Sequence, residues 1–238
     1  MKIQKAKGAI LLLIVLTLTI TLVNADPAGV NIVSNETEIV DAADPDNRTD
    51  PGGSITTLVL NALQQTNRWK AYIGNVTGTL TLADGSGDSI FSWALDDSSI
   101  TGEVYSSRSD NILWSQIRCA DNTIVTSEET FLGMDSSDIY SITETFNETL
   151  HPELTVGSTV ITEDTCASTS TYVNDAPQSQ ASADFPLTLL DDETNLVFVN
   201  PLNPQTAGFD GSLFDFQMIV PNNPSDSTTY FFYAEIGG

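Results

Sequence analysis

The chain has 238 residues and carries 32 Asp and Glu against 8 Lys and Arg, which gives a formal net charge of −24. A surface of this sign repels nucleic acid and anionic membranes, so neither is expected as a partner. It attracts cations and keeps an exposed protein soluble in salt. On charge alone, a solvated surface suited to saline surroundings is favoured over divalent-ion binding.

Met1–Ala25 has the organisation of a secretory signal peptide. A positive start is followed by an unbroken run of apolar residues and threonines over Ala9–Val23. Val23–Ala25 then offers small residues where signal peptidase cleaves. We expect cleavage after Ala25 and a mature chain that is secreted or held at the cell surface, without membrane contact of its own. Cleavage also removes three positive charges, those of Lys2, Lys5 and Lys7.

Two other interpretations of the N-terminus stay open. The apolar run is shorter than the roughly 20 residues of a membrane span, but it could be retained as an anchor. Lys7-Gly8-Ala9 could also be a prepilin-type cleavage site that leaves the run on the mature protein. Against this, Glu is missing at the usual early position, and Asp26-Pro27 ends any continuing helix. Near the C-terminus, no second apolar run indicates an anchor or sorting tail.

Residues 26–54 are predicted to form an extended arm and linker ahead of the main domain. Asp44–Gly53 combines Asp, Pro and Gly as loops do. A short apolar patch precedes it, formed by Val30, Ile32 and Val33. Donor-strand exchange between subunits requires a short apolar strand on a tether, so these residues are candidates for an assembly strand. The alternative, in which the patch pairs within its own domain, stays open.

The strongest β signal is the alternation over Lys70–Ala83, which sets apolar residues on one face and threonines on the other. Asp84–Asp88 has the composition of a turn, and Ile90–Leu95 alternates again, so the three segments predict a β-hairpin. Gly74 and Gly78 interrupt the first strand and suggest a bulge or a close backbone contact.

The rest of the chain predicts short strands joined by turns. Ser54–Gln65 is ambiguous, because a β-branched start suits a strand and its leucines could line a short helix. Further strands are predicted over Gly102–Ser107, Ile112–Cys119, Thr123–Val125, Ile139–Phe146, Val156–Ile161, Leu187–Leu190, Leu196–Val199, Leu213–Val220 and Thr229–Ile236. This pattern indicates an all-β fold, a β-sandwich or jelly roll of antiparallel strands. We expect residues 55–238 to form it as one domain.

The aromatic residues are expected mainly in the core. Trp69, Tyr105 and Trp114 occupy apolar positions of predicted strands. Tyr230–Tyr233 is a run of four aromatics, which alternation must divide between two faces. Either the last strand is buried on both faces, or it exposes aromatic surface to a neighbour.

The two cysteines, Cys119 and Cys166, are expected to form a disulfide. An even count in an exported protein favours pairing over free thiols. Two cysteines without a histidine cluster also make a poor zinc site. In the chain-entropy model, closing a loop of this length stabilises the fold by roughly 4 kcal/mol.

Four Asn-X-Thr sequons are candidate N-glycosylation sites in an exported chain, at Asn35, Asn47, Asn75 and Asn147. Such short motifs also arise by chance in a chain rich in Asn and Thr. Each candidate therefore depends on whether its side chain is accessible in the folded protein.

Few residues could carry catalysis. Hydrolysis by serine or cysteine needs a base, and the single histidine, His151, lies between a sequon and a proline, which indicates an exposed loop. Paired carboxylates could hydrolyse glycosides, but Asp and Glu are so frequent that no pair is distinctive. The sequence has no phosphate loop, haem-attachment motif or nucleophile elbow. We therefore expect a protein that is not an enzyme and needs no cofactor.

Acidic turns are better candidates for ligand binding. Asp84, Ser86 and Asp88 place oxygen atoms two residues apart on a glycine-permitted curve, as calcium loops do. Similar clusters occur at Asp96-Asp97, Asp135–Asp138 and Asp191–Glu193. Asp and Gly are also favoured at hairpin tips for turn geometry alone, and no cluster has the complete EF-hand spacing. We favour turns and keep calcium as the alternative.

Two segments, Arg68–Asp84 (RWKAYIGNVTGTLTLAD) and Gly102–Arg108 (GEVYSSR), resemble secreted archaeal β-domain proteins without an assigned activity. The resemblance covers only this part of the chain and includes no catalytic residues. It implies an archaeal envelope, which the signal, the low lysine content and the sequons also suit. Bacterial biofilm-matrix fibre proteins share the plan of signal, short arm and β domain, but no motif of theirs is present.

These features favour an extracellular or cell-surface structural or adhesive protein that assembles into filaments through its N-terminal strand. Export, the lack of catalytic groups, the expected disulfide and the apolar arm all point to it. The expected partners are further copies of the chain or other envelope components. The alternative is a secreted module that binds calcium or carbohydrate, and a secreted hydrolase comes third.

Overall fold

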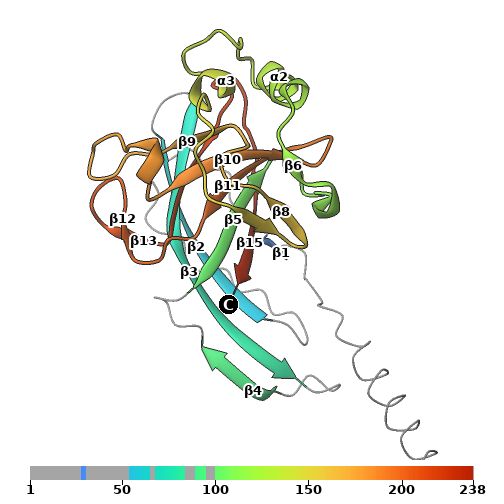
Figure 1. Cartoon of the computed structure of the whole chain (residues 1–238), viewed down its shortest axis with the longest axis vertical. Helices are drawn as coiled ribbons and strands as arrows, with labels where there is room; N and C mark the ends of the chain where they lie inside the picture. The colour runs from blue at the N-terminus through green and yellow to red at the C-terminus, as the bar shows by residue number, and fades with distance from the viewer. Residues whose placement is uncertain (1–27, 31–53, 65–67, 84–88, 95–99, 238) are drawn as a thin grey trace, which may run out of the picture.

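The computed structural model describes residues 28–30, 54–64, 68–83, 89–94 and 100–237 (Figure 1). Several predicted features lie outside the described residues: the signal Met1–Ala25, the arm residues Ile32 and Val33, the sequons Asn35 and Asn47, and the turn residues Asp84, Ser86 and Asp88. These predictions stay predictions. Within the described part of the chain, no helix is both long enough and apolar enough to cross a membrane.

The larger of two main sheets has seven strands, and all its pairings are antiparallel. In spatial order they are β1 (Ala28–Val30), β15 (Phe231–Gly237), β5 (Thr101–Ser107), β11 (Leu196–Pro201), β10 (Pro186–Asp191) and β6 (Arg118–Cys119), with β9 (Ser168–Ser170) also beside β10. The C-terminal strand β15 therefore lies between β5 and the N-terminal strand β1.

The smaller main sheet contains the predicted hairpin. Its strands are β14 (Phe216–Pro221), β3 (Trp69–Ala83) and β2 (Ser54–Gln64), with β4 (Ser89–Ala94) beside the second half of β3. The ambiguous segment Ser54–Gln65 thus forms a strand, as its β-branched start favours. Figure 1 shows β4 and the end of β3 projecting away from the rest of the molecule.

Of the two features suggested for Gly74 and Gly78, a bulge or a close backbone contact, the bulge is absent. Both glycines pair in the unbroken register between β2 and β3, Gly74 with Leu60 and Gly78 with Thr56. The irregularity lies further along β3, between Leu82 and Ala83, where the pairing with β4 shifts.

The main hydrophobic core lies between the two sheets. The smaller sheet contributes Trp69, Val76 and Phe216, and the larger sheet contributes Phe198 and Phe232, all with at most 4% of their surface exposed. Fully burying side chains of this size stabilises the fold by about 1.5–3 kcal/mol each. The shared core joins the two sheets.

The larger sheet is buried on its other face as well. There Tyr105, Val199 and Tyr233 form a second cluster with Trp114 and Leu154, which come from the long connection between β5 and β10. Every residue of β10 is buried, as expected for a strand covered on both sides. The same arrangement explains the aromatic run, because Phe232 faces the main core and Tyr233 the second cluster.

Two predicted strands are helical, which corrects the sequence-based assignment. Thr123–Val125 lies in α2 (Asn122–Phe131), which begins where the Asp121 carboxylate accepts a hydrogen bond from the Thr123 amide. Ile139–Phe146 contains α3 (Ile142–Thr145), which the Ser141 hydroxyl caps at the Glu144 amide. The caps and the burial of one helical face outweigh the strand preference of β-branched residues.

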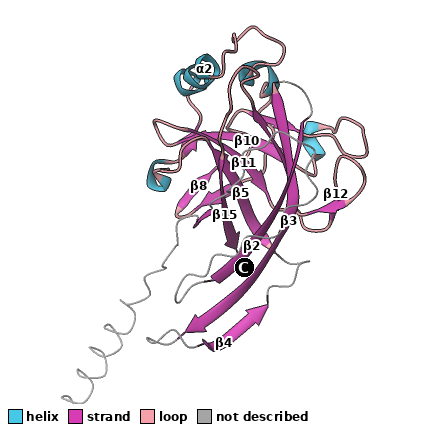
Figure 2. Ribbon diagram, turned by 180° about the vertical axis from the view of Figure 1, so that it is seen from behind, coloured by secondary structure: helices cyan, strands magenta, loops and turns pink. Residues whose placement is uncertain are grey.

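A third predicted strand, Ile112–Cys119, is mostly irregular. Its centre is the 3-10 helix η1 (Trp114–Gln116), and only β6 at its end pairs with β10. The remaining elements are two small hairpins and a second 3-10 helix: β7 (Leu154–Val156) with β8 (Thr159–Ile161), β12 (Thr206–Ala207) with β13 (Leu213–Phe214), and η2 (Gln180–Ser182). Figure 2 shows the helices at the margins of the strands. The predicted all-β class with antiparallel strands is confirmed.

Candidate functional site

The predicted disulfide between Cys119 and Cys166 is present. It joins β6 at the margin of the larger sheet to the segment that leads into β9, with the two Cα atoms 4.9 Å apart. Both cysteines of the chain are paired, so neither is available as a nucleophile or metal ligand. The bond fixes the long connection onto the sheet that it covers.

His151 is not in an exposed position, contrary to the expectation from its neighbours. Its side chain is buried, and Nε2 accepts hydrogen bonds from the amides of Thr165 and Cys166, at 3.0 and 2.9 Å. The other ring nitrogen, Nδ1, lies 2.7 Å from the carbonyl oxygen of Pro152 and therefore carries the hydrogen. A ring with both nitrogens engaged positions the disulfide segment and offers no free base.

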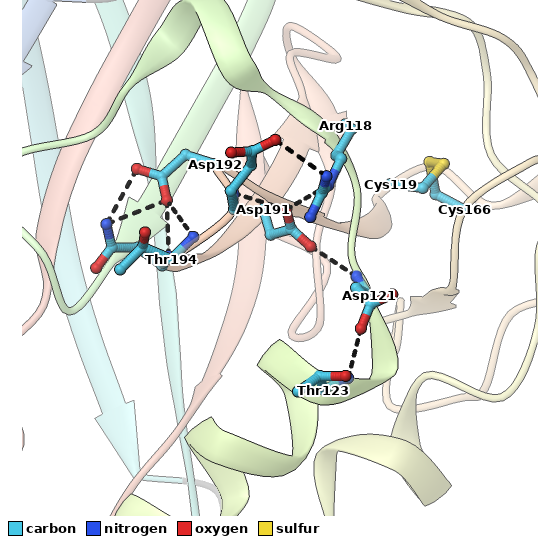
Figure 3. Close-up of polar contacts among 10 residues, drawn as sticks. Arg118, Cys119, Asp121, Thr123, Cys166, Asp191, Asp192 and Thr194 are labelled. Atoms are coloured by element: carbon cyan, nitrogen blue, oxygen red, sulfur yellow. Dashed lines mark hydrogen bonds and ion pairs between the residues drawn. A yellow bond between two sulfur atoms is a disulfide. The ribbon is translucent and has the colours of Figure 1, made fainter.

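The acidic run at Asp191–Glu193 is a structural network (Figure 3). The buried carboxylate of Asp191 accepts a hydrogen bond of 2.6 Å from the Asp121 amide and pairs with Arg118, whose Nε lies 2.9 Å from Oδ1. This contact ties the start of α2 to the end of β10. The Asp191 carboxylate is therefore occupied by donors of the protein itself, and its ion pair with Arg118 is formed within the chain.

Asp192 is equally enclosed by donors. Its carboxylate accepts hydrogen bonds from the amides of Leu113, Thr194 and Asn195, at 2.9, 3.0 and 2.7 Å, and from the Asn195 side chain. Burial on its own raises the pKa of Asp192, but these donors outweigh it and hold the pKa below the usual 3.8. The turn interpretation fits this cluster, because the oxygens bind the backbone.

Asp135 likewise supports a turn. Its Oδ1 accepts hydrogen bonds from the amide and hydroxyl of Ser137, at 3.0 and 2.7 Å, and these lower its pKa. Among the described residues, no three His, Cys, Asp or Glu side chains gather as metal ligands. The calcium candidates Asp84, Ser86 and Asp88 lie outside the described ranges.

The two described sequons differ in accessibility. Asn147 is exposed in the loop after α3, where a glycan would extend into solvent. Asn75 lies within β3 and is half-buried, with its Oδ1 enclosed and without a hydrogen-bond partner. Asn147 is therefore the better acceptor of the two in the folded chain.

A pair of carboxyl groups on the second face of the larger sheet was not predicted. Glu103 on β5 and Glu235 on β15 are directly opposite in the register of the two strands. The Tyr105 hydroxyl lies between them, 3.1 Å from Glu235 and 3.5 Å from Glu103. The hairpin of β7 and β8 covers the pair: Thr155 donates its amide to Glu103, and Gly157 donates its amide to Glu235.

The environment of this carboxyl pair favours one proton on Glu103. Burial raises the pKa of Glu103 to about 7, with a further rise from the charge of Glu235, while the Thr155 amide and the Tyr105 hydroxyl lower it. Burial and the two carboxylates also raise the pKa of Tyr105, which stays protonated and donates. The pair can therefore hold or release a proton near neutral pH, beneath the hairpin.

We expect Glu103→Gln to remove this pH dependence. Because the folded-state pKa of Glu103 is raised, the contribution of Glu103 to stability is greatest below pH 4.5 and is lost as the pH rises through about 7. The variant should resemble the wild type at pH 5 and exceed its free energy of unfolding by about 2 kcal/mol at pH 8. Urea unfolding at both pH values measures this, with the exposed Glu153→Gln as control. A variant less stable than the wild type at pH 8 would contradict it.

Strand β1 places Val30 at the edge of its own larger sheet. Ala28, Gly29 and Val30 pair with Ala234, Tyr233 and Phe232 of β15. In this structure β1 pairs within its own chain, which is the alternative to an intersubunit strand given in the sequence analysis. Since β15 has seven residues and β1 three, the strand covers only part of that edge.

An open depression of about 510 Å³ lies on the polar side of α2. It is lined by Asn122, Thr123, Thr126, Ser127 and Thr130. These amide and hydroxyl side chains can form hydrogen bonds, but they are neutral around pH 7 and do not exchange a proton there. The depression therefore offers neither an acid nor a base.

Comparison with known proteins gives no match: no protein family matches the chain, and neither do curated proteins or solved structures. The resemblance of residues 68–84 and 102–108 to secreted archaeal proteins therefore stays a prediction. Function has to be argued from the residues themselves.

Proposed function

We propose that the chain is an exported structural or adhesive protein of the cell surface, and that neighbouring copies join by exchanging strand β1. The observation that carries the proposal is the pairing of β1 with β15. It is a separate three-residue strand, joined to β2 by residues 31–53. Fully extended, a connection of that length spans on the order of 75 Å, enough to reach a neighbouring copy.

Exchange preserves every contact that β1 makes. The pairs Ala28–Ala234, Gly29–Tyr233 and Val30–Phe232 form equally well between two copies, because both supply the same residues. The strand also adds little to its own domain. Val30 is its only side chain larger than a methyl group, and its full burial would contribute about 1.5–3 kcal/mol.

The remainder of the domain has the stable fold that a structural subunit requires. The larger sheet is buried on both faces, and the disulfide fixes the connection that covers it. In the described acidic turn at Asp191–Glu193, the carboxylates of Asp191 and Asp192 bind the turn's own backbone. Export rests on the signal peptide, and the disulfide suits an oxidising compartment.

Deletion of residues 26–53 tests the role of the arm. The shortened protein should remain folded, since it keeps both cores, and it should no longer form fibres. Light scattering after size-exclusion chromatography and electron microscopy measure assembly, and circular dichroism measures folding. Val30→Ile, which keeps the strand, serves as the control and should assemble like the wild type. Fibres formed by the deletion variant would overturn the proposal.

A further inference from the structure

The smaller main sheet is free of acidic residues in a very acidic protein. The chain has 32 Asp and Glu, yet none lies in β2, β3, β4 or β14. Lys70 is the single charged residue of these four strands. In the larger sheet, by contrast, β5, β10 and β15 each contain an acidic residue: Glu103, Asp191 and Glu235. Acidic residues are therefore absent from one sheet and present in the other.

Strand β2 forms one edge of this sheet. It pairs with β3 along all eleven of its residues, from Ser54 opposite Leu80 to Gln64 opposite Lys70. Thr79 and Leu80 of β3 pair with β4 as well as with β2, so β4 lies on the other side of β3. Among the described strands, β3 is thus the only partner of β2, and the outer backbone edge of β2 is unpaired there.

The edge of β2 lacks the usual protection against pairing. Natural edge strands are guarded by lysine, proline, inward-pointing charges, bulges or short length. The sequence of β2, SITTLVLNALQ, contains no charge and no proline, and its register with β3 has no shift. A long, uncharged edge of this kind favours the addition of another strand.

We propose that β2 pairs antiparallel with β2 of a second copy of this chain, which makes one continuous sheet across two molecules. The inference rests on the proposed function, since it assumes that copies assemble, and it adds a contact separate from β1. A second copy is the occupant that the charges favour. Two copies of such an acidic chain repel each other, and the repulsion is weakest where neither presents a carboxylate.

The backbone supports a two-fold symmetric contact. When two identical edge strands run antiparallel, each N–H and C=O group of one faces its complement on the other, so a single surface is self-complementary. Figure 2 shows β3 and β4 projecting from the rest of the molecule, so this sheet continues beyond the part that carries α2. This contact would be isologous, whereas exchange of β1 could continue from copy to copy.

Cysteine scanning of β2 in the full mature chain tests the contact. Single cysteines are introduced at successive positions from Thr56 to Asn61, and the native cysteines do not interfere because they are paired. Opposite residues of an antiparallel pair have Cα atoms about 4.5–5.5 Å apart, within reach of a disulfide. Thr126→Cys, exposed on α2, is the matched control.

The expected result is a cross-linked dimer on a non-reducing gel, at least about tenfold more abundant than with Thr126→Cys, at the residues next to the symmetry axis. The yield should fall at positions further from that axis. If the mature protein assembles but no β2 cysteine cross-links above the control, the β2 contact is wrong and the proposed function stands. If the mature protein stays monomeric at high concentration without cross-linking, both are wrong.

Discussion

Asp192→Ala is expected to lower the free energy of unfolding by about 3 kcal/mol, because it removes the buried acceptor that three backbone amides share. The carboxylate is fully buried and binds the amides of Leu113, Thr194 and Asn195, so its loss affects both η1 and the turn after β10. Urea unfolding at pH 7 measures the change. Asp135→Ala, at an exposed turn, is the matched control and should leave the free energy of unfolding close to that of the wild type.

The effect of Asp192→Ala should also depend on pH in a defined direction. The donors around Asp192 lower its pKa, so its stabilisation is present above the unfolded value of 3.8 and is lost as the pH falls through the lower folded value. The difference between wild type and variant should therefore narrow in strong acid. Equal stabilities at pH 7 would show that the network around Asp192 does not hold the domain together.

Replacing both cysteines, in the double variant Cys119→Ser with Cys166→Ser, is expected to lower the free energy of unfolding by about 4 kcal/mol. The bond closes a loop between residues 47 apart in sequence, and that loop includes α2, α3 and the β7–β8 hairpin. The covering layer of the larger sheet would then be held only by its side chains and hydrogen bonds.

Unfolding in urea with and without reductant checks this disulfide prediction. Reductant should destabilise the wild type by a similar amount and leave the double variant unchanged, which separates loss of the bond from the effect of serine. A loss below about 1 kcal/mol in both comparisons would mean that the covering layer stays in place without the bond.

The sequence alone was sufficient to predict elements that follow from a local residue pattern, and a residue pairing for which few alternatives exist. Alternation over Lys70–Ala83 predicted β3, because a half-buried strand requires it. The disulfide followed from there being only two cysteines in a chain with a predicted export signal. The helix α2 was missed, since Thr123–Val125 is β-branched and the signal for a helix was the single capping residue Asp121.

The carboxyl pair was not predictable in the same way. Glu103 and Glu235 meet because β5 pairs with β15, and nothing in either segment specifies that partner. His151 was misplaced for a related reason, since its acceptor role depends on the amides of Thr165 and Cys166 across a loop. Alternation predicts which face a residue occupies, but the pairing of distant strands and loops decides what it meets there.

Strand exchange through β1 is tested most directly by mixing two variants that each gain one cysteine, Ala28→Cys and Ala234→Cys, and keep the native disulfide. These residues are directly opposite in the β1–β15 register, so a disulfide between them reports that pairing. In the mixture such a bond can form only between two chains. We predict, on a non-reducing gel, a covalent dimer that contains one copy of each variant and that is absent when either variant is incubated with the wild-type chain instead. The contradicting result is a mixture that gives no such dimer, while a single chain with both substitutions forms the disulfide within itself. Strand β1 would then pair with β15 of its own chain, and the exchange model would be wrong.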